Sequence, residues 1–269
     1  MILPPVLDKL LIISRRDLLT GLRYRTGFWL QSFSMIAELA ASFYLAQAIG
    51  PGFRPDGVDY YTFLLVGTAL FGFLIAGVAA SVKAVHDAQV TGTMEVLMTT
   101  STSAPVLVLL TTFSTFAGRT LYMIFYLAAG FALFQVPLDH PNLPACAVIF
   151  ALLLVIASSL GVMAAAVQVV TQKGGGVVFL LASLGGFLGG TMFPISVLPS
   201  SLRNLAELFP LTHAVQGTRL ALLQGASFAE LSPAIGVLSV YALLLLPASL
   251  YLFSSALRYS RRNGTLSFY

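Results

Sequence analysis

The stretch ACAVIFALLLVIASSLGVMAAAVQVVT occupies residues 145–171 and contains no charged residue. A helix of about 20 mainly apolar residues is long enough to cross the hydrocarbon core of a bilayer. In lipid such a run must be helical, because a helix satisfies every backbone N–H and C=O group within the segment. Residues 145–171 therefore predict a transmembrane helix.

The rest of the chain repeats this pattern. The 269 residues are 58% hydrophobic and only 9% charged, whereas a soluble domain carries about 25% charged residues. These values exclude a water-soluble globule and a disordered chain, and the single Cys146 excludes a disulfide scaffold. We expect an all-α polytopic membrane protein whose transmembrane domain covers residues 28–257. Besides 145–171, the predicted spans are 28–48, 61–82, 107–136, 175–193 and 233–257.

The basic residues predict the orientation of these spans. With the N-terminus in the cytoplasm, ten of the 14 Lys and Arg residues fall on the cytoplasmic side and three on the outer side, while Arg119 lies within the third span. Cytoplasmic loops of membrane proteins carry such an excess of Lys and Arg. The sequence therefore predicts six spans with both termini in the cytoplasm.

The segments outside the spans differ in character. Residues 1–27 place leucines on one helical face and Arg15, Arg16 and Arg23 among the polar positions, which favours an amphipathic helix lying in the membrane interface. The simpler alternative is a positively charged anchor for the first span. Residues 258–269 form a basic tail that we place in the cytoplasm.

Two loops are more apolar than plain connectors. The cytoplasmic loop 83–105 predicts a short helix with an exposed apolar and acidic side, a candidate docking element for a soluble partner. The outer loop after the fifth span is also hydrophobic, but Pro194, Pro199 and Pro210 divide it into pieces too short to span. We expect those pieces to be short re-entrant helices, because irregular backbone at membrane depth is tolerated where protein covers it.

Two charges fall inside predicted spans. Glu38 lies near the middle of the first span and Arg119 lies in the third. A charge at mid-bilayer costs about 2.5–3.5 kcal/mol on insertion scales, so it usually meets a partner or a wet cavity. The two alternatives are an ion pair joining the first and third spans, or side chains that line a cavity.

Sequence motifs of nucleotide-binding or hydrolytic enzymes are missing from the chain. No Gly-Lys pair of a phosphate-binding loop occurs, and neither H-E-x-x-H nor G-x-S-x-G is present. His86, His140 and His213 are far apart and assigned to loops, so no metal site is expected. We predict no catalytic residue in this chain.

Two motifs resemble one known family. Residues 91–105, TGTMEVLMTTSTSAP, are similar to the cytoplasmic signature of ABC-2 type transporter permeases. The region from Gly189 to Gly225 resembles the family's "F-P … L-P … N-P-L-T … R … G" tail, with Phe209 where the pattern usually has Asn. The matching positions of that tail are Phe193-Pro194, Leu198-Pro199, Phe209-Pro210, Leu211-Thr212-His213, Arg219 and Gly225.

The resemblance implies a half-size permease subunit of a bacterial ABC exporter in the inner membrane. Two copies would pair, and two ATP-binding cassette subunits would dock from the cytoplasm. ATP and Mg would bind to those subunits, with no cofactor in this chain. The cargo would be a drug, a lipid or a lipid-linked glycan, and the apolar spans favour an amphipathic one. No nucleic acid is an expected partner.

The resemblance also implies roles for particular residues. The segment 84–100 would be the coupling helix that contacts the ATPase, and residues 1–27 would form a connecting helix through Arg15, Arg16 and Arg23. Phe193, Pro194, Pro199 and Pro210 would belong to the re-entrant cap. The coupling residues would be Thr91, Gly92, Thr93, Met94, Glu95, Val96 and Leu97. The candidates for a pathway between two copies are Phe28, Gln31, Met35, Glu38, Phe71, Phe73 and Arg119.

Two other functions remain open from the residues alone. An ion-coupled secondary carrier needs inverted repeats or a chain of ionisable residues in the membrane, of which only Glu38 and Arg119 qualify. A non-transporting scaffold subunit is the third reading, although the loop 83–105 argues against it.

Overall fold

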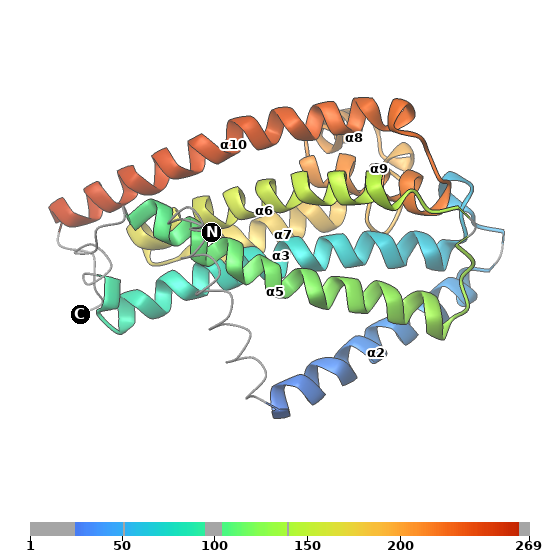
Figure 1. Ribbon diagram of the computed structural model, residues 1–269, viewed down its shortest axis with the longest axis horizontal. Helices are drawn as coiled ribbons and strands as arrows, with labels where there is room; N and C mark the ends of the chain where they lie inside the picture. The colour runs from blue at the N-terminus through green and yellow to red at the C-terminus, as the bar shows by residue number, and fades with distance from the viewer. Residues whose placement is uncertain (1–24, 51, 95–103, 139, 264–269) are drawn as a thin grey trace, which may run out of the picture.

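The computed structural model describes residues 25–50, 52–94, 104–138 and 140–263, and this part of the chain is helical without strands. Figure 1 shows an elongated bundle in which most helices run along the long axis. The elements are α2 (Arg25–Ile49), η1 (Pro55–Gly57), α3 (Tyr60–Val90), α5 (Ala104–Leu133), α6 (Leu143–Thr171), α7 (Gly174–Leu188), η2 (Ile195–Val197), α8 (Ser200–Glu207), α9 (Pro210–Leu223) and α10 (Phe228–Asn263).

The predicted fold class is confirmed, with one span shorter than expected. Within the described residues, α2, α3, α5, α6 and α10 are long and apolar enough to cross a membrane. The predicted span 175–193 is α7, an apolar helix of only 15 residues. It ends early because Gly190, with φ of 63°, turns the chain out of the helix.

The bundle has two chemically different ends (Figure 1). The basic end holds the end of α3, the turn between α6 and α7, and the end of α10, and it carries Lys83, Lys173 and Arg258. The cap end holds η1, α8 and α9. Arg54, Arg203 and Arg219, the three basic residues assigned to the outer side, belong to the cap end.

The core forms where α3 and α6 pack together with α9, α10 and α5. Phe73 on α3 lies against Phe116 of α5 and Phe150 of α6, with ring centroids 5.2 and 5.1 Å apart. The Phe116 ring occupies the space where a Cβ at Gly77 would lie. A glycine is therefore required on α3 for this approach of α5.

The first span, α2, is attached to the bundle through one end (Figure 1). Its Phe43 stacks on Phe134, the residue that follows α5, at 4.2 Å, and it meets Tyr61 of α3 edge to face at 5.4 Å. Towards its N-terminus the helix diverges from the bundle, and Trp29 and Phe33 are 71% and 73% exposed. An apolar face of α2 is therefore not covered by the other described residues.

The predicted re-entrant pieces are short helices, as expected. Pro194 and Pro199 immediately precede η2 and α8, and Pro210 is the first residue of α9. Proline at a helix start is favoured because its fixed φ suits the helix and its missing N–H would have no intrahelical partner. α9 then packs into the bundle against α6, α10 and α3, so its backbone is covered by protein.

Two helices continue past the predicted boundaries of a span and of the tail. The second span was expected to end at residue 82, but α3 continues to Val90, and Lys83 and Asp87 form an ion pair of 2.7 Å one turn apart on it. The predicted tail begins at residue 258, but α10 continues to Asn263. The amphipathic helix proposed for residues 1–27, with Arg15, Arg16 and Arg23, lies almost entirely outside the described residues.

Candidate functional site

The first candidate region is the end of α3, where the coupling residues were predicted. The Thr91 hydroxyl donates to the Asp87 carbonyl at 2.8 Å and lies 3.0 Å from the Thr93 hydroxyl. Gly92 has φ of 69°, which favours glycine and lets the chain turn away from the helix. Thr91, Gly92 and Thr93 are all exposed at the basic end.

Met94 does not belong to this exposed surface, which corrects the prediction that it faces a partner. Its side chain is 2% exposed and packs in an apolar cluster with Val85, Val108 and Val169. The turn after α3 is therefore anchored on the bundle by Met94. Glu95, Val96 and Leu97, the other predicted coupling residues, lie outside the described residues.

The second region is a polar cluster between α2, α3 and α5. The Tyr126 hydroxyl lies 3.3 Å from the Thr68 hydroxyl and also interacts with the Ser42 side chain. Glu38 is exposed and lies within electrostatic reach of Tyr122 and Tyr126. We did not single out these hydroxyls from the sequence, although polar residues inside long apolar spans were a usable signal.

Glu38 and Arg119 do not form the predicted ion pair. Both side chains are described, and no salt bridge joins them. Tyr122 lies one turn after Arg119 on α5 and is within electrostatic reach of both charges. The two charged residues therefore approach the same tyrosine without contacting each other.

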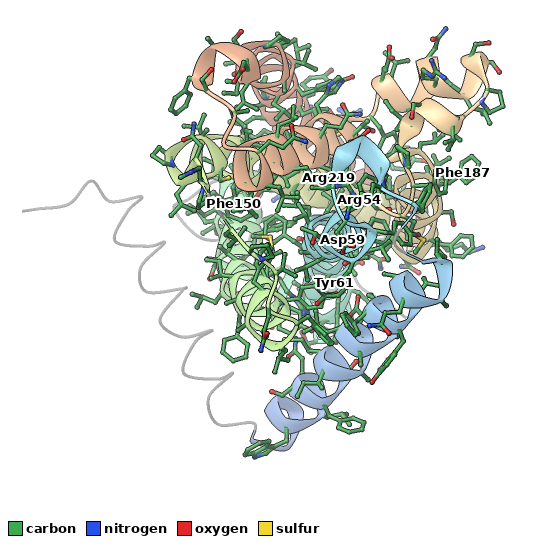
Figure 2. The ribbon with its side chains drawn as sticks, turned by 90° about the vertical axis from the view of Figure 1, so that its right-hand side faces the viewer. Arg54, Asp59, Tyr61, Phe150, Phe187 and Arg219 are labelled. Carbon is green, nitrogen blue, oxygen red and sulfur yellow. The ribbon has the colours of Figure 1, made fainter. Side chains whose placement is uncertain are left out.

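The third region is the cap end, where Arg219 of α9 is 4% exposed. Its Nη1 donates to the Gly190 carbonyl at 2.8 Å, and its Nη2 donates to the carbonyls of Phe63 at 2.8 Å and Thr191 at 3.0 Å. The guanidinium carbon also lies 3.3 Å from the centroid of the Phe63 ring. Figure 2 shows Arg219 near the start of α3, where Asp59 precedes the helix and Tyr61 lies in its first turn.

This guanidinium is held by carbonyl dipoles and an aromatic ring rather than by a carboxylate. Burial lowers the pKa of Arg219 to about 9, and the negative charge of Asp56 opposes this shift. The side chain is therefore still protonated at neutral pH. Among the described residues, its Nε finds no acceptor. From the sequence, Arg219 was identified only as a basic residue of the outer side and as a position of the second motif. Its burial could not be predicted, because it depends on contacts with α3 and with the turn after α7.

A comparison with models of protein families identifies the family of this chain. The model of the ABC-2 family transporter proteins matches residues 35–251, which includes the polar cluster, the turn after α3 and the cap. The chain belongs to the ABC-2 transporter family. No curated protein matches it.

Membership makes this ABC-2 permease a membrane transport component with several spans, and it implies association with an ATP-binding cassette subunit. Transport components of this family are generally not catalytic. The expectations drawn from the two sequence motifs are therefore confirmed at the level of family and transport role.

The pathway candidates of the permease separate into two groups. Met35 and Phe73 are each 3% exposed and belong to the hydrophobic core of the chain, and their assignment to a pathway stays a prediction. Gln31 and Glu38 are exposed on α2, and Arg119 is partly exposed on α5. Phe71 is partly exposed and packs against Gly185 and Gly186 of α7, and the side chain of Phe28 is outside the described residues.

Proposed function

We propose that this permease is the membrane subunit of an ATP-driven exporter. An ATP-binding cassette subunit would carry ATP and Mg and would dock at the basic end. The observation that carries the proposal is the position of Thr91–Thr93. This turn lies within the family match and is exposed, yet it continues directly from α3 and is anchored by buried Met94.

This arrangement supports transmission of force. A docked subunit that moves the turn also moves α3, because the helix is continuous from Tyr60 to Val90. α3 packs against α6, α5, α7, α2 and α9. A movement of α3 would therefore change its contacts with most of the bundle. Coupling between two sites requires contacts that differ between two conformational states.

A second copy of the chain would cover the exposed apolar faces of α2 and α7. On α2, Trp29, Leu30 and Phe33 are exposed, and on α7, Phe179 and Leu180 are 74% and 55% exposed. Both helices adjoin α3. The pathway would then lie between the copies, beside Glu38 and the Tyr122–Tyr126 hydroxyls.

The nature of the described surfaces favours an amphipathic cargo. The exposed faces of α2 and α7 are aliphatic and aromatic, with few polar groups apart from Gln31, Glu38 and the neighbouring hydroxyls. A strongly hydrated ion would need a more polar lining. We therefore propose export of a drug-like molecule, a lipid or a lipid-linked glycan.

The test is co-purification of the permease with an ATP-binding cassette subunit, followed by ATP hydrolysis in nanodiscs. Glu95→Ala and Gly92→Pro should each lower the coupled hydrolysis at least threefold. Glu207→Ala is the matched control for Glu95→Ala, because Glu207 is exposed on α8 at the cap end, away from the turn after α3. Undiminished hydrolysis in both coupling variants would overturn the docking assignment, and transport driven by a proton gradient without an ATPase would replace it by a secondary carrier.

Dimer formation has a separate test. Phe179→Cys in a Cys146→Ala background should give a disulfide-linked dimer on oxidation in membranes, whereas Leu243→Cys on the equally exposed face of α10 should not. Cross-linking of both variants to the same extent would argue against α7 as part of the interface.

A further inference from the structure

A buried glutamine joins three helix ends at the basic end of the bundle. Gln168, near the end of α6, is 2% exposed, and its Oε1 accepts from the backbone N–H of Gly174 at 2.8 Å. Gly174 is the first residue of α7, whose N-cap residue Lys173 makes no side-chain capping bond. Gln168 therefore supplies a cap to α7 from another helix, satisfying a donor that the helix itself cannot.

The amide nitrogen of the same side chain contacts α3. Gln168 Nε2 donates to Gln89 Oε1 at 3.1 Å and lies 3.3 Å from Nδ1 of His86. Gln89 is 1% exposed, and its own amide donates to the Val169 carbonyl at 3.4 Å. His86 thus lies on a helix facing this network and not on the loop expected from the sequence.

The side chains around the network are tightly packed against the backbone of Gly174. A Cβ at Gly174 would lie 2.7 Å from Cγ1 of Val82 and 2.8 Å from Cβ of Gln168. Contacts below 3.0 Å cannot be accommodated without displacement of the neighbours. The start of α7 is therefore seated directly on both α3 and α6.

The position of the network relates it to the turn after α3. Gln89 lies two residues before Thr91, where the proposed docking surface begins. At the other end of α7, the carbonyls of Gly190 and Thr191 are held by Arg219. α7, about 22 Å long at 1.5 Å per residue, is thus fixed by a buried polar side chain at each end.

We propose that Gln168 is a positioning residue that transmits movement of the end of α3 to α7. This inference rests on the proposed function, since the movement would be imposed by the ATP-binding subunit. A buried network in which each glutamine amide oxygen and nitrogen has a partner has few alternative arrangements, because any unmade bond would leave a buried polar group unsatisfied. α7 therefore follows α3 as the turn moves, and it carries that movement towards the cap.

The test is hydrogen–deuterium exchange of the permease in complex with its ATP-binding subunit, with and without Mg-ATP and vanadate. In the native complex, trapping should change exchange in peptides from 84–94 and from 174–180. Gln168→Met keeps the side-chain volume but removes the amide. In this variant the change in 84–94 should persist, and the change in 174–180 should fall to less than about a quarter of the native one. Resting exchange of 174–180 should rise about fivefold because the cap is lost.

Two further variants separate transmission from simple destabilisation. Gln89→Met keeps the cap on α7 and removes both bonds between Gln89 and α6, so resting exchange of 174–180 should stay unchanged while its response to trapping falls. Gln47→Met makes the same chemical change on an exposed position of α2 and should leave both responses as in the native complex.

The outcomes distinguish the two proposals. A native response in 174–180 in both Gln168→Met and Gln89→Met would overturn the inference alone. If Gln168→Met fails to assemble, Gln89→Met decides it by the same criterion. Absence of any response at 84–94 in the native complex would overturn the proposed function, and the inference with it.

Discussion

Gly67 on α3 lies directly beneath the guanidinium of Arg219 on α9. A Cβ at this position would meet Nη2 of Arg219 and the Thr191 carbonyl oxygen that accepts from it. The absence of a side chain at Gly67 therefore allows the arginine and the turn after α7 to approach the α3 backbone. This contact joins the cap to the bundle.

Gly67→Ala should consequently destabilise the permease. Inserting a methyl group into a tightly packed site costs about 1–3 kcal/mol, so thermal unfolding in detergent should begin at a lower temperature. Gly72→Ala is the control on the same helix, because its Cβ would meet nothing within 4 Å and alanine is the better helix former. Equal melting temperatures for the two variants would contradict the proposed approach.

Arg219→Met should lower the free energy of unfolding more than the same substitution at an exposed arginine does. It leaves the carbonyls of Gly190, Thr191 and Phe63 without their charged donor, a loss of about 3 kcal/mol. Arg219→Lys should recover only part of it, because an ammonium lacks the planar fork that reaches several acceptors. The measurement is thermal unfolding together with hydrogen exchange of residues 189–200.

The comparison for this experiment is Arg203→Met on α8. Arg203 also donates to backbone carbonyls, those of Ser196 and Leu198, but these bonds are exposed or only partly buried. Its loss should shift the free energy of unfolding by less than about 1 kcal/mol. A larger effect at Arg203 than at Arg219 would show that burial of the guanidinium does not stabilise the cap.

Glu38 and Arg119 should behave as independent sites. Because no ion pair joins them, a double-mutant cycle of Glu38→Gln and Arg119→Met should give an interaction free energy below about 0.5 kcal/mol. Tyr126→Phe with Thr68→Val is the positive comparison, since these hydroxyls lie 3.3 Å apart. A coupling of 1 kcal/mol or more between Glu38 and Arg119 would restore the ion pair predicted from the sequence.

Met94→Ala should loosen the turn after α3 from the bundle. The side chain is buried in the apolar cluster of Val85, Val108 and Val169, and removing a buried methionine side chain costs about 2–5 kcal/mol. We expect a lower melting temperature and faster hydrogen exchange in 84–94. Thr93→Ala, on the exposed side of the same turn, should change the melting temperature by no more than about 2 °C.

The membrane class and the approximate spans followed from the sequence, because they depend only on the length of apolar runs and on backbone hydrogen bonding in lipid. Residues 145–171 and 107–136 illustrate this, since α6 and α5 begin and end within three residues of them. The short outer helices could also be predicted from the sequence, because Pro194, Pro199 and Pro210 each fix the start of a helix through local backbone geometry.

Tertiary contacts determined the features that do not follow from local sequence patterns. The length of α3 beyond residue 82 depends on burial of Val85 and Gln89 against α6, and the burial of Met94 depends on the same neighbours. Glu38 and Arg119 were predicted to pair because their charges are opposite. Pairing also requires that the two helices turn these side chains towards each other, and the orientation of each helix about its axis is determined by packing. Gln168 and Arg219 acquired their roles in the same way: each side chain bonds to backbone brought near by other helices, and the spacing along the chain does not encode that proximity.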